Sequence, residues 1–361
     1  MTATAATETA MKSKTILKGT ITSDVTLAAG NTYKLSGEYI VEEGATLHIE
    51  EGVKIIAVYD DIADYILVKQ GGKINAVGTP DKPIVMTSEK EEPGAWGGIH
   101  ICGRAHTNAE GGKGSSEIGG AVYGGNDDAD NSGTLQYIRL EYTGFAFDEE
   151  HEANGISFYG VGNGTIVDHC QAYKGSDDGF EFFGGSVNVS NLVAVSCSDD
   201  SFDWTEGWNG KGTNLVAYQE DKSTLGYDCD CLMECDNNGS NNAATPVAHP
   251  VLKNLILVGN GGSKQGIRLR AGTEVEIDNA KVCGKGQPLT VETALTENAL
   301  KNGTSKLTNI TLTSELSSKE GIYTHADFIA VTSNKVDANL SYSSFEDIRK
   351  ECSWMNGSWV K

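Results

Sequence analysis

Double aspartates precede an aromatic–acid–aromatic triplet in two neighbouring stretches, GSDDGFEFFGG (Gly175–Gly185) and CSDDSFDWTEG (Cys197–Gly207). Their acidic residues are Asp177, Asp178, Glu181, Asp199, Asp200 and Asp203. Carboxylates in pairs can act as general acid and base on a glycosidic bond, and clustered carboxylates can bind a hard cation such as Ca²⁺. The second stretch begins 22 residues after the first, so the motif is also typical of a repeating fold.

Short segments with alternating apolar residues recur along the chain and predict its fold. A glycine or another residue followed by an apolar–x–apolar pattern occurs at 98–101, 155–158, 179–182, 201–204, 232–235 and 266–269. A second series opens with Asn191, Asn214, Asn254, Asn279 and Asn309. Each segment has the period of a strand and is too short to bury its apolar face alone, so stacked coils must share one core. The sequence predicts an all-β fold, a right-handed single-stranded parallel β-helix (solenoid) with terminal caps and inserted loops.

The domain organisation follows from where this pattern begins and fades. We expect a disordered tether at residues 1–14, the β-helix at 15–313 and a C-terminal cap at 314–361 that contains an amphipathic helix. A helix is expected near 293–302, ended by Gly303. Polar loops are expected at 106–131 and 236–249. The recurring asparagines are expected to stack at a turn and to hydrogen-bond one another.

Alternation along the strands predicts which side chains share a column. The middle residue of each first-series triplet points outward, and successive coils lie ~4.8 Å apart. This outward column contains His100, Ser157, Glu181, Asp203, Glu234 and Arg268. A second column contains Asp177, Asp199 and Asp230, doubled by Asp178 and Asp200. Stacked like charges repel, so the columns require a bound cation or raised pKa values, unless the aspartates simply cap backbone N–H groups at turns.

Candidate roles follow from these positions. The candidate calcium ligands are Asp177, Asp178, Asp199, Asp200 and Asp230. In a hydrolase, the acid and base candidates are Glu181, Asp203 and Glu234, and in a calcium-dependent lyase the candidate base is Arg268. Trp208 follows a strand and is expected to be exposed and to stack on a sugar ring, with His100 and Arg270 as further binding candidates.

Composition limits the possible partners. The net charge of −22 and the pI near 4.6 argue against nucleic acid, and against polyanionic surfaces unless a cation forms a bridge. No apolar run has the length of a membrane span. The eight cysteines permit full disulfide pairing in an oxidising compartment. The spacing of Cys229, Cys231 and Cys235 without a nearby histidine disfavours a zinc site.

Several segments together resemble a family of exported bacterial right-handed β-helix proteins, many of them lipid-anchored at the outer membrane. They are Gly44–Gly52, Gly71–Thr79, Pro83–Ser88, Trp96–Ala105, Asp177–Gly185 and Glu234–Asn238. The resemblance implies an extracytoplasmic protein, secreted or anchored at the surface. The wider fold class is similar to pectate lyases, polygalacturonases and phage tailspikes. The chain lacks the Gly-His-Gly element of the polygalacturonases, and Arg268–Arg270 matches their basic triplet only loosely.

Three classes of function stay open at this point. The first is a binding or adhesion protein that engages a glycan or a surface protein through the acidic face, with Ca²⁺ as its candidate cofactor. The second is a polysaccharide lyase or glycoside hydrolase that uses carboxylates on adjacent coils. The third is a structural spike or scaffold. The missing catalytic signatures favour binding, because one fold hosts many functions.

Overall fold

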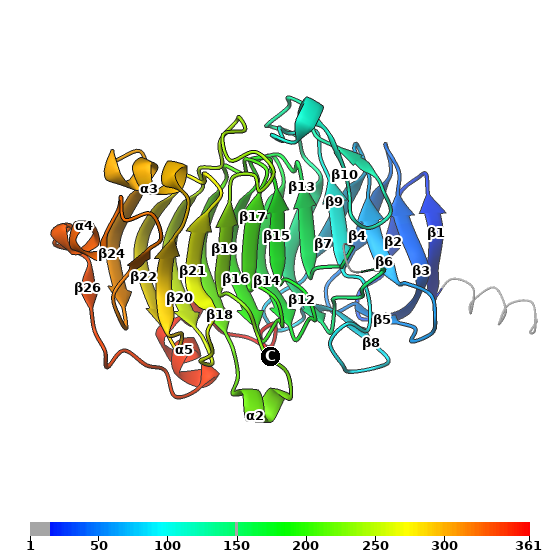
Figure 1. Cartoon of the computed structure of the whole chain (residues 1–361). Helices are drawn as coiled ribbons and strands as arrows, with labels where there is room; N and C mark the ends of the chain where they lie inside the picture. Colours follow the sequence, from blue (N-terminus) through cyan, green and yellow to red (C-terminus); the bar gives the residue numbers. More distant parts are fainter. Residues whose placement is uncertain (1–14, 149–150) are drawn as a thin grey trace, which may run out of the picture.

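The computed structural model describes residues 15–148 and 151–361. Within these residues, each strand of the main sheet pairs in parallel with strands from the neighbouring coils. Figure 1 shows the coils stacked from β1 at one end to β26 at the other, as a right-handed parallel β-helix. The predicted fold is therefore confirmed. The tether predicted at residues 1–14 lies outside the described residues.

The strands are short and follow one another around each coil. The N-terminal coils contain β1 (Ile16–Ile21), β2 (Val25–Leu27), β3 (Thr32–Val41), β4 (Thr46–Ile49), β5 (Lys54–Ala57), β6 (Tyr65–Val68), β7 (Lys73–Val77), β8 (Ile84–Ser88) and β9 (Ile99–Cys102). The central coils contain β12 (Gly133–Glu141), β13 (Ile156–Tyr159), β14 (Ile166–Tyr173), β15 (Phe180–Phe183), β16 (Asn188–Val195), β17 (Phe202–Thr205), β18 (Lys211–Tyr218) and β19 (Met233–Asp236). The C-terminal coils contain β20 (Val251–Val258), β21 (Gln265–Arg270), β22 (Glu276–Cys283), β23 (Gln287–Val291), β24 (Lys306–Leu312), β25 (Ser317–Ser318) and β26 (Lys335–Val336).

Helices and one small hairpin lie outside the coils. The helical segments are η1 (Glu110–Gly112), α2 (Lys222–Leu225), α3 (Ala294–Lys301), α4 (His325–Ala330), α5 (Phe345–Glu351) and η2 (Ser353–Met355). Strands β10 (Gly114–Ser115) and β11 (Val122–Tyr123) form an antiparallel pair in the segment between β9 and β12. The helix expected near 293–302 is thus α3, and the amphipathic helix expected near the C-terminus is α5.

Aromatic side chains stack along the core in the central coils. The rings of Phe158 and Phe182 lie 5.0 Å apart, and those of Phe180 and Phe202 lie 5.6 Å apart, both nearly parallel. All four side chains are buried. Offset stacking of this kind adds stability beyond the area that each ring buries. The period-2 alternation that places these rings inside also places the residues between them on the outer surface.

An asparagine ladder turns the chain in the middle of the longer strands. Left-handed backbone angles, with φ between 55° and 64°, occur at Asn191, Asn214, Asn254, Asn279 and Asn309. Asn214 donates a hydrogen bond to Asn191 over 2.8 Å, Asn254 to Asn214 over 3.1 Å, and Asn279 to Asn254 over 2.9 Å. Asparagine tolerates this backbone conformation better than most residues. The stacked turn predicted from the repeats is confirmed.

The C-terminal segment does more than close the end of the solenoid. Helix α4 and strands β25 and β26 lie at that end, whereas α5 and the last residues return along its side, and the C-terminus lies beside the central coils (Figure 1). There Ile348, Met355 and Trp359 pack with Val193 and Val216 in one apolar cluster. The predicted cap at 314–361 is therefore only partly a cap, because the outward valines of β16 and β18 also need cover.

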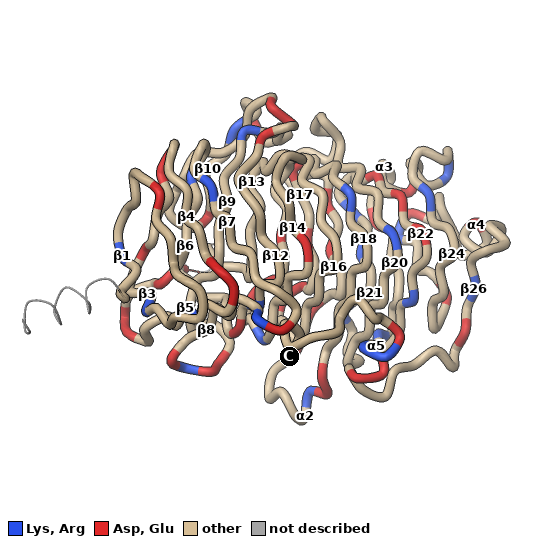
Figure 2. Tube along the Cα trace, turned by 180° about the vertical axis from the view of Figure 1, so that it is seen from behind, with Lys and Arg blue, Asp and Glu red and all other residues tan. Residues whose placement is uncertain are grey.

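Charged residues are spread over the whole length of the solenoid (Figure 2). The backbone view therefore does not single out one charged region, and clusters of acidic or basic residues are identified below from the contacts between side chains.

Candidate functional site

The strand pairing places the predicted outward column in register. Ser157 lies opposite His100 on one side and Glu181 on the other. Glu181 then pairs with Asp203, and Asp203 with Glu234. Glu234 pairs in turn with Arg268 of the next coil. The column predicted from the sequence is therefore present, with three carboxylates on successive coils.

A pocket of about 190 Å³ opens beside this column and is lined only by acidic residues. The lining residues are Glu117, Glu152, Asp177, Asp178, Glu181, Asp199 and Asp203. We refer to this group as the acidic pocket. Five of its members come from the two double-aspartate stretches, whereas Glu117 and Glu152 come from segments inserted between strands. Among the described residues, no lysine, arginine or histidine lines the pocket.

Oxygen atoms of the acidic pocket and its neighbours lie close enough to share a cation. Each of three groups places one carboxylate oxygen per residue within 4.8 Å of the others. These groups are Asp177–Asp178–Asp199, Asp178–Glu181–Asp203 and Asp199–Asp200–Asp230. An all-oxygen donor set with several carboxylates suits Ca²⁺ better than Zn²⁺. The five predicted metal ligands are thus brought together.

Burial and mutual repulsion shift the titration of the acidic pocket. Burial, followed by the charge of Asp199, raises the pKa of Asp177 to about 8. Burial raises the pKa of Glu117 to about 7, and burial with the charge of Asp230 raises that of Asp199 to about 6. The pKa values of Asp178, Glu181 and Asp203 are raised for the same reasons. The pocket therefore holds protons near neutral pH unless a cation replaces them.

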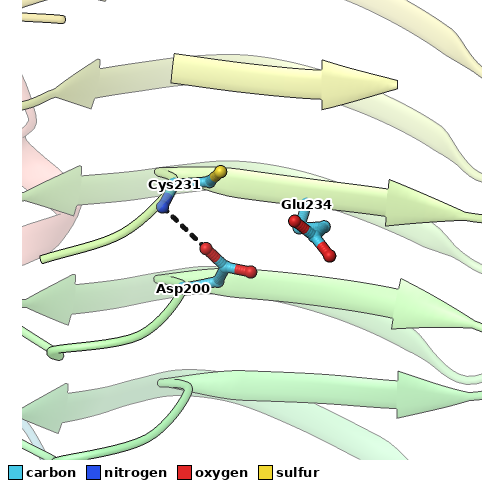
Figure 3. Close-up of side chains that lie close together, drawn as sticks. All are labelled: Asp200, Cys231 and Glu234. Carbon is cyan, nitrogen blue, oxygen red and sulfur yellow. Dashed lines mark hydrogen bonds between the residues drawn. The ribbon is translucent and has the colours of Figure 1, made fainter. Parts of the chain in front are cut away.

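Two aspartates also cap the backbone of the next coil. Asp178 accepts a hydrogen bond from the backbone N–H of Asp200 over 2.8 Å, and Asp200 accepts one from that of Cys231 over 2.7 Å (Figure 3). The turn-capping interpretation is thus correct for one oxygen of each carboxylate. Such a bond leaves the second carboxylate oxygen as a further acceptor, so capping and cation binding are compatible.

A buried amide supports Glu181 from the preceding coil. Asn154 donates hydrogen bonds to Ser157 over 2.9 Å and to Glu181 over 2.6 Å. Its Oδ1 atom is buried and has no hydrogen-bond partner. Burial raises the pKa of the nearby Tyr159 phenol well above its usual value, and the charges of Glu117 and Glu181 add to this effect. The amide of Asn154 therefore fixes the position of Glu181 relative to Ser157 of the preceding coil.

The carboxylates at the other end of the column are paired with arginines. Arg268 contacts Glu234 at 3.1 Å and Glu292 at 3.2 Å, and Arg270 contacts Asp236 at 2.7 Å and also Glu234. We call these five residues the arginine-paired end. Nearby, Lys264 pairs with Asp230 at 2.6 Å. The carboxylates of the outward column thus differ along its length. Glu234 is paired with arginines, whereas Glu181 and Asp203 line a pocket made of acidic residues.

Two predicted binding residues are wrong because they are buried. Trp208 is 1 % exposed, its ring stacks 4.1 Å from that of Phe182, and its indole N–H donates to the carbonyl of Val187. His100 is 0 % exposed, and burial lowers its pKa to about 4. The residues that cover the outer face near His100 include Ile118 and Tyr123, from the inserted segment after β9.

The two predicted arginine roles are also corrected. Burial opposes the charge of Arg268, but hydrogen bonding to Glu292 and the charge of Glu234 keep its pKa above the usual value. An arginine with a raised pKa cannot act as a general base near neutral pH. Arg270 is engaged with Asp236 and Glu234, so it is a partner of the column rather than a free binding residue.

The sequence interpretation missed four residues of these two regions. Glu117 and Glu152 lie outside the repeat, so no alignment of coils could place them. Asp236 could have been found, because the pattern Glu-x-Asp at 234–236 lies in register with Arg-x-Arg at 268–270.

The cysteines form no disulfide among the described residues, and all eight thiols are buried. Asp200, Cys231 and Glu234 lie together as one further cluster (Figure 3). Burial raises the pKa of the Cys231 thiol, and the charges of Asp200 and Asp230 add to this effect. A thiol binds metal as the thiolate, so this cluster is a weaker candidate than the all-oxygen groups.

Comparison with protein families gives one match. A family model described as "Pectate-lyase like beta helix domain" matches residues 19–360. No curated protein and no solved structure matches at a significant level. No helix among residues 15–148 and 151–361 is long and apolar enough to span a membrane.

Proposed function

We propose that this chain, which belongs to the pectate-lyase-like β-helix family, is an extracytoplasmic polysaccharide-binding protein whose acidic pocket holds Ca²⁺. The observation that carries the proposal is a pocket that, within residues 15–148 and 151–361, is lined by seven carboxylates and by no basic side chain. The family supports a role related to polysaccharides, and the choice of binding, of Ca²⁺ and of location is our inference. A surface protein in place of a glycan is the other partner that this face could engage.

The residues of the pocket fit a hard cation. Asp177, Asp178 and Asp199 at one side, and Glu181 and Asp203 at the other, are the side chains that would hold it. A bound Ca²⁺ ion would supply positive charge at a surface that otherwise repels anions. This matters for a protein with a net charge of −22, because an acidic polysaccharide could approach only through a bridging cation. Uronic acid polymers, with a carboxylate on each sugar, are therefore the substrate class that fits best.

Hydrolysis is the second candidate, because of one specific group of side chains. Asp178, Glu181 and Asp203 have carboxylate oxygens within 4.8 Å of one another, close to the separation of about 5 Å in retaining glycosidases. A raised pKa would let one of Glu181 and Asp203 keep a proton for the leaving group, while the other, ionised, would act as the nucleophile. The same carboxylates cannot hold a cation tightly and donate a proton at once, so the two candidates are separable.

The test compares binding, cleavage and stability in the same samples. The protein is incubated with polygalacturonate and alginate, and with neutral glucans, in Ca²⁺ or in EDTA. We expect Ca²⁺-dependent retention of the acidic polymers without new reducing ends, and a higher melting temperature in Ca²⁺. At a free Ca²⁺ concentration of 100 times Kd, the added stability is about 2.7 kcal/mol.

Matched variants assign the result to the pocket. Asp203→Asn should lose both the binding and the Ca²⁺-dependent rise in melting temperature, whereas Asp278→Asn, a surface aspartate on β22, should keep both. Cleavage products that disappear in Glu181→Gln would favour the hydrolase. A melting temperature and polymer binding that are the same in Ca²⁺ and EDTA would rule out the calcium site.

A further inference from the structure

A second concave site lies on a different part of the coils. It is a groove of about 320 Å³ between the asparagine ladder and the C-terminal segment that returns along the solenoid. Its residues come from β18, β20 and β22 on one side and from the segment around α5 and η2 on the other. None of them belongs to the acidic pocket. The volume lies at the lower end of the range for small-ligand sites.

One wall of this groove is a row of amides. Asn214, Asn254 and Asn279 line it on three successive coils. In the ladder, Asn279 donates one amide hydrogen to Asn254, and Asn254 donates one to Asn214. Each amide nitrogen carries a second hydrogen, and each amide oxygen a second lone pair. The ladder thus fixes the orientation of these groups while leaving donors and acceptors for a ligand.

The facing wall supplies an aromatic and an apolar surface. Trp354 is partly exposed and lies at the edge of an aromatic cluster, with its ring 6.4 Å from that of His169 and 6.3 Å from that of Trp359. Val216 and Ile256, both buried, also line the groove and support this wall from the core side. Tryptophan offers a large rigid face at a low cost in conformational entropy. Such a surface next to a row of amides suits a ligand with both C–H faces and hydroxyl groups.

The charges around the groove cancel one another. Lys281 and Glu351 both line it, and they form an ion pair with each other. Glu351 also accepts a hydrogen bond from Tyr342 over 2.8 Å. No other charged side chain lines the groove among the described residues. An ionic ligand would have to break this pair, whereas a neutral ligand would not.

We propose that this groove binds a neutral sugar unit, with Trp354 against its C–H face and the ladder amides on its hydroxyl groups. The site is independent of the calcium proposal, because the two share no residue and one takes a neutral ligand whereas the other takes an acidic one. The protein would then hold two kinds of sugar, one acidic through the pocket and one neutral through the groove.

Titration in EDTA tests the groove while the acidic pocket lacks a divalent cation. The probes are neutral cello-, xylo-, manno- and chito-oligosaccharides, followed by calorimetry and by tryptophan fluorescence, with oligogalacturonate as the charged comparison. We expect saturable binding of at least one neutral series and none of oligogalacturonate. Trp354→Ala and Asn279→Asp should each weaken that binding at least tenfold, whereas Trp354→Phe, which keeps an aromatic face, should stay within about threefold.

Two controls make the outcome decisive. Asp203→Asn should bind the neutral sugar as well as the wild type, and each groove variant should keep a cooperative urea-unfolding transition, which shows that it is folded. Absence of binding by every neutral series at millimolar concentration would overturn the proposal. Unchanged affinity in both Trp354→Ala and Asn279→Asp would overturn it as well.

Discussion

The acidic pocket and the arginine-paired end occupy the same outward column of one solenoid, yet their charges are balanced in different ways. At the arginine-paired end, Glu234 lies in register with Arg268, and Asp236 with Arg270. In the acidic pocket, Glu181 lies between Ser157 and Asp203, and no basic side chain from the described part of the chain lines the site. Two arginines on a neighbouring coil pair with the carboxylates at the arginine-paired end of the column. The unpaired carboxylates of the acidic pocket therefore lower the stability of the protein. The β-helix fold does not require this loss, because the same column is paired at its other end.

This difference suggests different roles for the two regions: the arginine-paired end stabilises the fold, and the acidic pocket is the candidate binding site. Ion pairs between neighbouring coils hold Arg268 and Arg270 in place. The charges there are already paired within the protein, so a ligand would gain little by binding to them. Clustered carboxylates with raised pKa values are unstable as a group and gain free energy when protons or a cation bind them. Groups with strongly shifted pKa values are concentrated at functional sites. Selection for stability alone would replace such carboxylates. The predictions below test whether the two regions respond in opposite directions.

The largest expected effect is a loss of stability of the apo protein as pH rises. The pKa values of about 6 for Asp199, 7 for Glu117 and 8 for Asp177 all lie above those of unfolded acidic residues. The folded state then binds more protons than the unfolded state, so stability falls as pH rises through these values. Between pH 5 and pH 8 in EDTA, urea unfolding should show a loss of several kcal/mol, because each pKa unit that is crossed counts about 1.4 kcal/mol.

The same unfolding experiment is repeated with Ca²⁺ in place of EDTA. With saturating Ca²⁺, the cation takes the place of the protons, and the stability at pH 8 should approach that at pH 5. A free energy of unfolding in EDTA that does not change from pH 5 to pH 8 would show that repulsion among the carboxylates does not destabilise the protein.

The next effect concerns the arginine-paired end. Arg270→Ala removes the partner of Asp236 and one partner of Glu234, both mostly buried. Breaking a fully buried pair costs about 3–5 kcal/mol, and the 30 % exposure of Arg270 reduces this to roughly 2 kcal/mol. Lys82→Ala, which breaks the exposed pair with Glu51, is the control and should cost less than about 1 kcal/mol. Equal losses in the two variants, measured by urea unfolding, would contradict the comparison.

The repeat allowed the sequence to predict much of this arrangement. Period-2 alternation and the coil spacing placed Glu181, Asp203 and Glu234 in one column, and the strand register agrees. Burial was not predictable in the same way. His100 has the outward position that the alternation gives it, but the inserted segment with Ile118 and Tyr123 covers that face. Glu117 belongs to the same segment, and a loop outside the repeat has no register from which its position could be inferred.

The smallest effect is the sharpest test, because its sign should differ between the two regions. In EDTA at pH 8, Glu181→Gln removes the cost of protonating a buried carboxyl that is ionised in the unfolded chain, and it should stabilise the protein by roughly 1 kcal/mol, the free energy of about one pKa unit. The new amide can still accept the hydrogen bond that Asn154 donates to Glu181. Glu234→Gln is the matched change on the next coil but one, and it should destabilise, because Arg268 and Arg270 lose a charged partner. Destabilisation by both variants in EDTA would mean that the two regions are equivalent and that the acidic pocket needs no cation.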